Sequence, residues 1–135
     1  MIKAIFLETL PENFRHEKIF LIKNKLNDPK KLSLLSDSEL NIIQKSYSLC
    51  TLNNLRKIRA IAIFKDKLLI SPHESYLLLH CGIGSIKSLS ILNPYDLKDR
   101  IGRLERSLRT NSQTKITLPI LKKWIQRANQ ICKSI

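Results

Sequence analysis

Cysteine is scarce in this 135-residue sequence, and no two cysteines lie near one another. Cys50, Cys81 and Cys132 form no C-x-x-C pattern, so neither a disulfide framework nor a zinc site is predicted. Long apolar runs are also absent. The opening segment MIKAIFLETLPENF has only a four-residue apolar run before Glu8, too short for a secretory signal, and no later run reaches the length of a membrane span. We therefore expect a soluble, cytoplasmic protein with reduced thiols and no membrane insertion.

Residues that would support catalysis are also few. His16, His73 and His80 are separated from one another in the sequence, and no His-Glu-x-x-His pattern occurs. The sequence contains no P-loop, nucleophile elbow or dinucleotide-binding fingerprint. Most acidic residues fall at predicted helix starts, where capping accounts for them. We expect a protein that is not an enzyme and needs no metal or cofactor.

Acidic residues are outnumbered by basic ones. Lys and Arg total 24 against 11 Asp and Glu, a formal net charge of +13. Such an excess attracts polyanions, namely nucleic acid, an anionic membrane surface or an acidic protein. Compositional drift is the alternative, because Lys, Ile, Asn and Ser are abundant throughout. The charge is concentrated late in the chain, since residues 103–135 carry eight cations and one acid whereas residues 73–102 are neutral overall.

Capping patterns mark the helix boundaries. A side-chain acceptor followed three residues later by a carboxylate satisfies free amides at a helix start, and four such pairs occur: Thr9 with Glu12, Ser36 with Glu39, Ser71 with Glu74, and Asn93 with Asp96. Further candidate caps are Asp28, Thr51, Ser85 and Thr117. With the apolar periodicity, they predict eight helices at about 10–25, 29–35, 37–48, 52–64, 72–81, 86–92, 94–109 and 118–133. We expect an all-α fold, a compact bundle forming one domain over residues 1–135.

Three segments of the chain resemble one another. LNDPKKLSLLSDSEL (residues 26–40) aligns with IGSIKSLSILNPYDL (83–97), and residues 39–55 align with residues 73–89. Each unit is a helix, a tight turn around an aliphatic residue, and a short helix with a core-facing leucine. We expect stacked repeat-like units at about 10–35, 37–64 and 72–109, followed by the C-terminal helix at 118–133.

Three stretches carry a resemblance to a known family: LRKIRAIAIF (55–64), ISPHESYLLLHCGIGSIKSLSILNPYDL (70–97) and LKKWIQRANQI (121–131). They resemble helix-hairpin-helix proteins, and more closely a tandem helix-hairpin-helix family of unknown function that is frequent in cyanobacteria. The resemblance implies a small all-α bundle whose hairpin amides and nearby cations contact the DNA backbone without reading sequence. The chain departs from that pattern at LLISPHES, YSLCT and NKLND, which lack glycine, so one turn alone keeps the candidate anion site.

That turn is Gly82-Ile83-Gly84-Ser85. Glycine adopts positive φ at no steric cost and permits close approach, so the turn can direct free amides at a phosphate, and Lys87 adds a charge. The predicted hairpin anion site is therefore Gly82, Gly84, Ser85 and Lys87. The alternative is that Gly82 merely ends the preceding helix.

Cations also recur on the outward sides of the two last predicted helices, at helical spacing from Arg100 onward. Guanidinium and ammonium groups suit phosphate, and such binding depends strongly on salt; a merely solvated helix face is the alternative. The predicted flanking surface consists of Arg103, Arg106, Arg109, Lys122, Lys123 and Arg127.

We therefore predict a non-enzymatic module that binds the backbone of DNA or RNA without sequence preference. The alternative is a protein–protein interaction or scaffold module whose basic face meets an acidic partner or a larger assembly. The glycines missing from LLISPHES favour this alternative.

Overall fold

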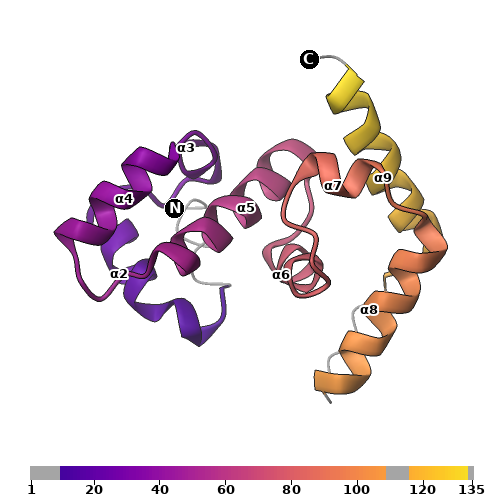
Figure 1. Ribbon diagram of the computed structural model, residues 1–135, viewed down its shortest axis with the longest axis horizontal. Coiled ribbons are helices and arrows are strands. Elements are labelled where there is room, and N and C mark those ends of the chain that lie inside the picture. Colours follow the sequence, from indigo (N-terminus) through magenta and orange to yellow (C-terminus); the bar gives the residue numbers. More distant parts are fainter. Residues whose placement is uncertain (1–9, 109–115, 134–135) are drawn as a thin grey trace. The chain divides into compact units, whose positions relative to one another are not determined.

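The computed structural model describes residues 10–108 and 116–133. Within these ranges all regular structure is helical, with no strand, which confirms the all-α prediction (Figure 1). A 3-10 turn η1 (Glu12–Phe14) precedes eight α-helices in the described ranges: α2 (Arg15–Lys23), α3 (Pro29–Ser33), α4 (Asp37–Ser46), α5 (Leu52–Leu68), α6 (Pro72–His80), α7 (Ile86–Ser90), α8 (Pro94–Leu108) and α9 (Leu118–Lys133). The predicted cap Thr9 lies outside the described residues.

Packing divides the chain into two compact units, residues 1–73 and residues 74–135, here called the N-terminal and C-terminal units. In the N-terminal unit α5 packs against α3 and α4. Its core is a cluster of Leu40, Ile43, Cys50 and Leu55, with partly buried side chains around it. The expectation of one domain over the whole chain stays a prediction.

Several predicted helix caps are confirmed. Ser36 and Glu39 form a reciprocal box, in which the Ser36 hydroxyl accepts the Glu39 N–H at 3.1 Å and the Glu39 carboxylate accepts the Ser36 N–H at 3.0 Å. The side chains of Asp28 and Thr51 cap α3 and α5. These short-range bonds satisfy amides that a helix leaves free at its start, which is why α3, α4 and α5 begin where the sequence predicts. The first helix, predicted from about residue 10, instead begins as α2 at Arg15, after η1 and without a side-chain cap.

A buried carboxylate joins α2 to the start of α5. Glu17 is 1% exposed, and its two oxygens accept the Thr51 backbone N–H at 2.9 Å and the Asn54 side-chain amide at 3.3 Å. A negative charge at this position also complements the positive end of the α5 dipole. Burial, and then the Glu17 charge, raise the pKa of the neighbouring Cys50 thiol to about 11.

The turns after α2 and after α6 have the same backbone hydrogen bonds. In each, a left-handed residue donates to the carbonyl three residues earlier, and the next residue donates to the carbonyl five residues earlier, the Schellman ending of a helix. The left-handed residues are Lys25 (φ 60°) and Gly82 (φ 87°). The residues that follow, Leu26 and Ile83, donate at 2.8 and 2.9 Å. Leu26 and Ile83 are also paired in the alignment of residues 26–40 with residues 83–97, and the repeat itself stays a prediction.

The turn between α4 and α5 is different. Leu49, the predicted equivalent of Ile83, is 53% exposed, and Cys50 takes the buried place. The cause lies in the end of α4, where Tyr47 is extended (φ −138°) rather than left-handed, so the chain leaves the helix in another direction.

In the C-terminal unit α9 packs against both α7 and α8 (Figure 1). Its buried stripe consists of Leu121, Trp124, Ile125 and Ala128. The Asn129 side-chain amide donates to the Ser90 carbonyl at 3.1 Å, which ties α9 to the end of α7. No helix among the described residues is both long and apolar enough to cross a membrane.

Candidate nucleic-acid interface

The two-glycine turn connects α6 to α7 in the C-terminal unit. Gly82 ends α6 in a left-handed conformation that L side chains rarely adopt, which explains the first glycine. Ile83 is buried at 2% exposure, whereas Gly84 and Ser85 are exposed. Ser85 caps α7, because its hydroxyl accepts the Ser88 N–H at 3.1 Å.

Some of the amides in this turn already have acceptors. Gly82 and Ile83 donate to carbonyls of α6, at 3.0 and 2.9 Å, so their N–H groups are occupied. No described residue accepts a hydrogen bond from the amides of Gly84, Ile86 or Lys87. Gly82 thus shapes the turn, while the amides left for an external acceptor lie at the start of α7.

Arg100 of α8 lies near this turn, although it was not among the predicted site residues. Burial raises the pKa of the Cys81 thiol, the Arg100 charge acts to lower it, and Glu105 acts to raise it. Arg100 is therefore close enough to Cys81, the residue before Gly82, to change its electrostatic environment. The sequence places Arg100 in the arginine series of α8 but gives no indication that this part of α8 returns to the end of α6.

The predicted arginines of α8 are on its outer side. Arg103 and Arg106 are exposed, and the Arg106 guanidinium lies over Gly102, with Nη1 3.5 Å from the position of an added Cβ. Arg109, the next arginine of the series, lies outside the described residues. A hollow of about 510 Å³ on this surface is lined by Lys98, Asp99, Gly102, Arg103 and Arg106.

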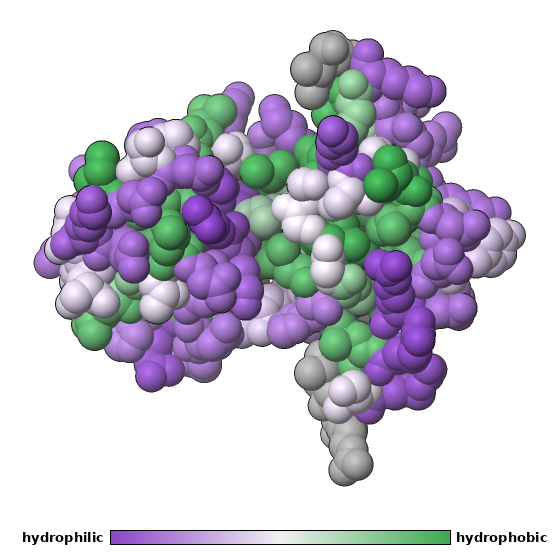
Figure 2. All heavy atoms as spheres, in the orientation of Figure 1, coloured by the Kyte–Doolittle hydropathy of each residue, from purple (hydrophilic) through white to green (hydrophobic). Residues whose placement is uncertain are grey.

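The outward face of α9 carries cations and amides. Lys122, Lys123 and Arg127 are all exposed, as predicted, and α9 contains no Asp or Glu. Figure 2 shows hydrophilic residues along the outer edges of α8 and α9. Within the part of the chain that the structure describes, Arg103, Arg106, Lys123 and Arg127 form no ion pair. Their charges are therefore available to an external anion.

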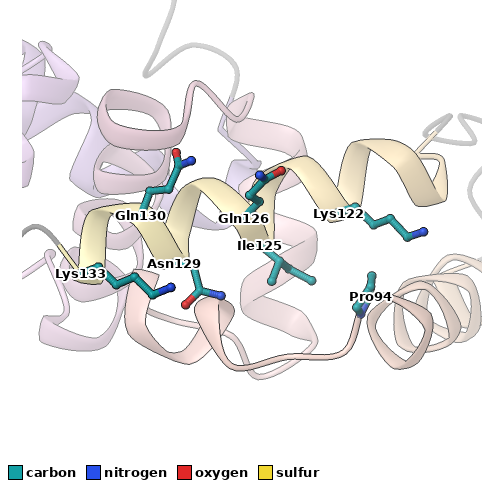
Figure 3. Close-up of a pocket in the computed structure, with 7 residues that line it drawn as sticks. All are labelled: Pro94, Lys122, Ile125, Gln126, Asn129, Gln130 and Lys133. Atoms are coloured by element: carbon teal, nitrogen blue, oxygen red, sulfur yellow. The ribbon is translucent and has the colours of Figure 1, made fainter.

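A pocket of about 410 Å³ lies along α9 where α8 begins (Figure 3). In this view Ile125 and Pro94 point towards each other, and Lys122 and Lys133 lie at the two ends of the row of side chains. These lysines are eleven residues apart, about 16 Å along a helix. Amides fill the space between them, and they supply both donors and acceptors. The pocket is lined by Pro94, Lys122, Ile125, Gln126, Asn129, Gln130 and Lys133.

Two exposed apolar residues lie on either side of Asn93 and Pro94 in the sequence. Ile91 is 80% exposed and Tyr95 is 59% exposed. The Lys122 ammonium lies 5.6 Å from the centroid of the Tyr95 ring, a cation–π contact that holds this lysine beside the start of α8. Sequence reasoning singled out neither apolar residue, because an isolated exposed side chain has no local signature.

A family described as a domain of unknown function, DUF4332, matches residues 14–131. The match includes the α6–α7 turn, all of α8, and α9 as far as Ile131. The chain belongs to this family. No curated protein and no solved structure matches the chain. The predicted resemblance to an uncharacterised family is thereby confirmed, while the helix-hairpin-helix character of DUF4332 and its frequency in cyanobacteria stay predictions.

In this DUF4332 chain, the described residues contain no group of three or more His, Cys, Asp and Glu side chains that could hold a metal ion. The chemistry offered by the C-terminal unit is therefore that of exposed cations, side-chain amides and a few backbone N–H groups. All three are donors suited to phosphate oxygens.

Proposed function

We propose that this DUF4332 protein is a non-enzymatic, cytoplasmic module that binds the sugar-phosphate backbone of DNA or RNA without sequence preference. The observation that carries the proposal is the set of exposed cations of the C-terminal unit that lack an ion pair with any described residue: Arg103, Arg106, Lys123 and Arg127. Because α9 has no acidic residue, this helix places no negative charge that would repel a polyanion.

The charge arrangement sets the expected salt dependence. Each phosphate that is neutralised on duplex DNA contributes about −0.9 to the slope of log K against log salt. With Lys122 added, five described cations of the predicted surface are available, and five contacts give a slope of about −4.5. Raising the salt concentration from 50 to 200 mM would then weaken binding about 500-fold.

The α6–α7 turn would add a smaller contribution. The amides of Gly84, Ile86 and Lys87 have no acceptor among the described residues, and the Lys87 side chain is exposed. Near the end of α6, Arg100 contributes a positive charge and Glu105 a negative one. A phosphate bound here would receive neutral and charged donors together.

The test is fluorescence anisotropy with labelled DNA and RNA duplexes and single strands over a salt series. We expect Arg103→Gln with Arg106→Gln to reduce the magnitude of the slope by about 1.8. Lys23→Gln with Lys45→Gln is the matched control, because these exposed lysines of the N-terminal unit remove the same charge. The proposal would be contradicted if the two double variants reduced the salt slope equally, or if the wild type did not bind at about 0.1 M salt.

A protein-interaction module is the second candidate function. It is favoured by the exposed Ile91 and Tyr95, which backbone binding does not require. Its occupant would be an acidic protein with an apolar contact beside its carboxylates. Replacing the exposed Ile91 by alanine would leave nucleic-acid binding nearly unchanged, while complex formation with such a protein would be weakened.

A further inference from the structure

The outward face of α9 has an unusual composition. Beyond Pro119, every exposed residue of this helix is Lys, Arg, Gln or Asn. Backbone binding calls for cations, yet three of these seven residues are neutral amides: Gln126, Asn129 and Gln130. Side-chain amides pair in a bidentate manner with the adenine edge, and Arg or Lys pairs with the guanine edge. The face therefore contains the residue types that contact base edges.

The spacing of these side chains places four of them on one stripe. Lys123, Gln126, Arg127 and Gln130 follow the i, i+3, i+4, i+7 pattern, so they share one side of α9. The stripe is about 10.5 Å long, close to three base-pair steps of ~3.4 Å. The opposite side of the helix, through Leu121 and Ala128, is buried in the C-terminal unit, so the stripe faces outward.

We infer that α9 enters the major groove of duplex DNA and that Lys123, Gln126, Arg127 and Gln130 contact base edges there. The major groove of B-form DNA is about 12 Å wide and admits an α-helix with its side chains. The charge is complementary, because α9 has no acidic residue. Lys122 and Lys133, at the ends of the pocket beside α8, lie on the side of α9 that would face a phosphate backbone bordering the groove.

This role rests on the proposed function and narrows it in two ways. The major groove of A-form RNA is deep and too narrow for side chains to read, so α9 selects DNA duplexes over RNA duplexes. On most DNA sequences Lys123 and Arg127 neutralise phosphates, as in the proposed backbone binding, which is indifferent to sequence. On a preferred site of about three base pairs they turn to base edges, so a short sequence preference is added to that binding.

The variant that tests the inference is Gln126→Ala with Gln130→Ala. Both residues are exposed on a helix, and alanine favours helix, so the fold should be retained; thermal unfolding followed by circular dichroism checks this. Asn41→Ala with Gln44→Ala is the matched control, because it removes two exposed amides from α4. Binding is measured to a randomised DNA duplex pool and to DNA and RNA duplexes of one sequence.

We expect the wild type to enrich a motif of about three base pairs and to prefer the DNA duplex. The α9 variant removes two amides and should lose roughly 30-fold or more of its preference for that motif while keeping its salt slope, and the α4 variant should behave as wild type. Equal affinity for the DNA and RNA duplexes with no enriched motif, or preference for single strands, overturns the major-groove role but leaves backbone binding intact. Absence of binding to any nucleic acid removes both proposals together.

Discussion

Replacement of Gly82 by alanine tests the conformation of the turn between α6 and α7. Gly82 has φ 87°, and a Cβ at this position would meet no atom within 4 Å, so the cost of a side chain comes from the backbone alone. Gly84 is the matched comparison two residues later. It is not among the positive-φ residues of the described chain, and its added Cβ would lie 3.9 Å from Cδ2 of Leu79, an ordinary contact.

The magnitudes follow from these geometries. An L residue in the left-handed region costs about 1–2 kcal/mol. Alanine in place of glycine also raises the free energy of unfolding by about 0.4–1 kcal/mol at either position, because it reduces the conformational entropy of the unfolded chain. We therefore expect Gly82→Ala to lower the free energy of unfolding by about 1 kcal/mol and Gly84→Ala to raise it by about 0.5 kcal/mol. Lys25 has φ 60° at the equivalent position of the turn after α2. Lys25→Gly should therefore stabilise the N-terminal unit by about 0.5 kcal/mol.

The measurement is urea unfolding followed by circular dichroism, in which the midpoint shifts while the slope with denaturant stays constant. The sign of the difference between Gly82→Ala and Gly84→Ala is the decisive quantity. If the two alanine variants were equally stable, or if Gly82→Ala matched the wild type, the left-handed ending of α6 would be the wrong description of this turn.

Three further predictions concern stability. Glu17→Ala should cost about 3 kcal/mol in urea unfolding, because it leaves the Thr51 N–H and the Asn54 amide without their charged acceptor. Leu89→Ala, at a fully buried position, should cost about 2–5 kcal/mol, whereas an equal loss from the exposed Ile91→Ala would contradict the packing described for α7. A hydrogen bond from the Arg59 guanidinium of α5, and then the charge of Arg59, hold the pKa of Asp37 below its usual 3.8. This pair therefore stabilises the fold above pH 3.8, and the stabilisation is lost as the pH falls through the lower pKa of the folded state. Asp37→Asn should therefore flatten the acid end of the stability profile, measured as urea midpoints between about pH 5 and pH 2.

The parts of the fold that could be predicted are those fixed by neighbours in sequence. The Ser36–Glu39 box and the caps at Asp28 and Ser85 each join residues two or three positions apart, so residue type and spacing determine them. The end of α5 could not be predicted in this way. The helix continues to Leu68, which is buried at 3% exposure, and tertiary burial outweighs the polar Lys65–Lys67 segment that suggested an earlier end.

The same distinction applies to the candidate interface. Helical periodicity predicts which cations of α8 and α9 face outward, and the structure agrees for Arg103, Arg106 and Lys123. The state of the turn amides depends instead on how α6 ends. Whether Gly82 donates to an α6 carbonyl or remains free is a question of backbone conformation, and the residue pattern fits both outcomes. The hydrogen bond between Glu17 and the Thr51 amide could not be predicted either, because the two residues lie 34 positions apart and no local pattern indicates their contact.

The two left-handed turns show why similar backbones do not imply similar anion sites. In the N-terminal unit the cap of α3 is Asp28, whose carboxylate accepts the Lys30 N–H at 3.1 Å, so a phosphate approaching this helix start meets a negative charge already in place. In the C-terminal unit the cap of α7 is the neutral Ser85 hydroxyl, and Lys87 stands in the first turn without a neighbouring carboxylate in the sequence. The cap residue, more than the number of glycines, therefore makes the α6–α7 turn the better candidate for phosphate.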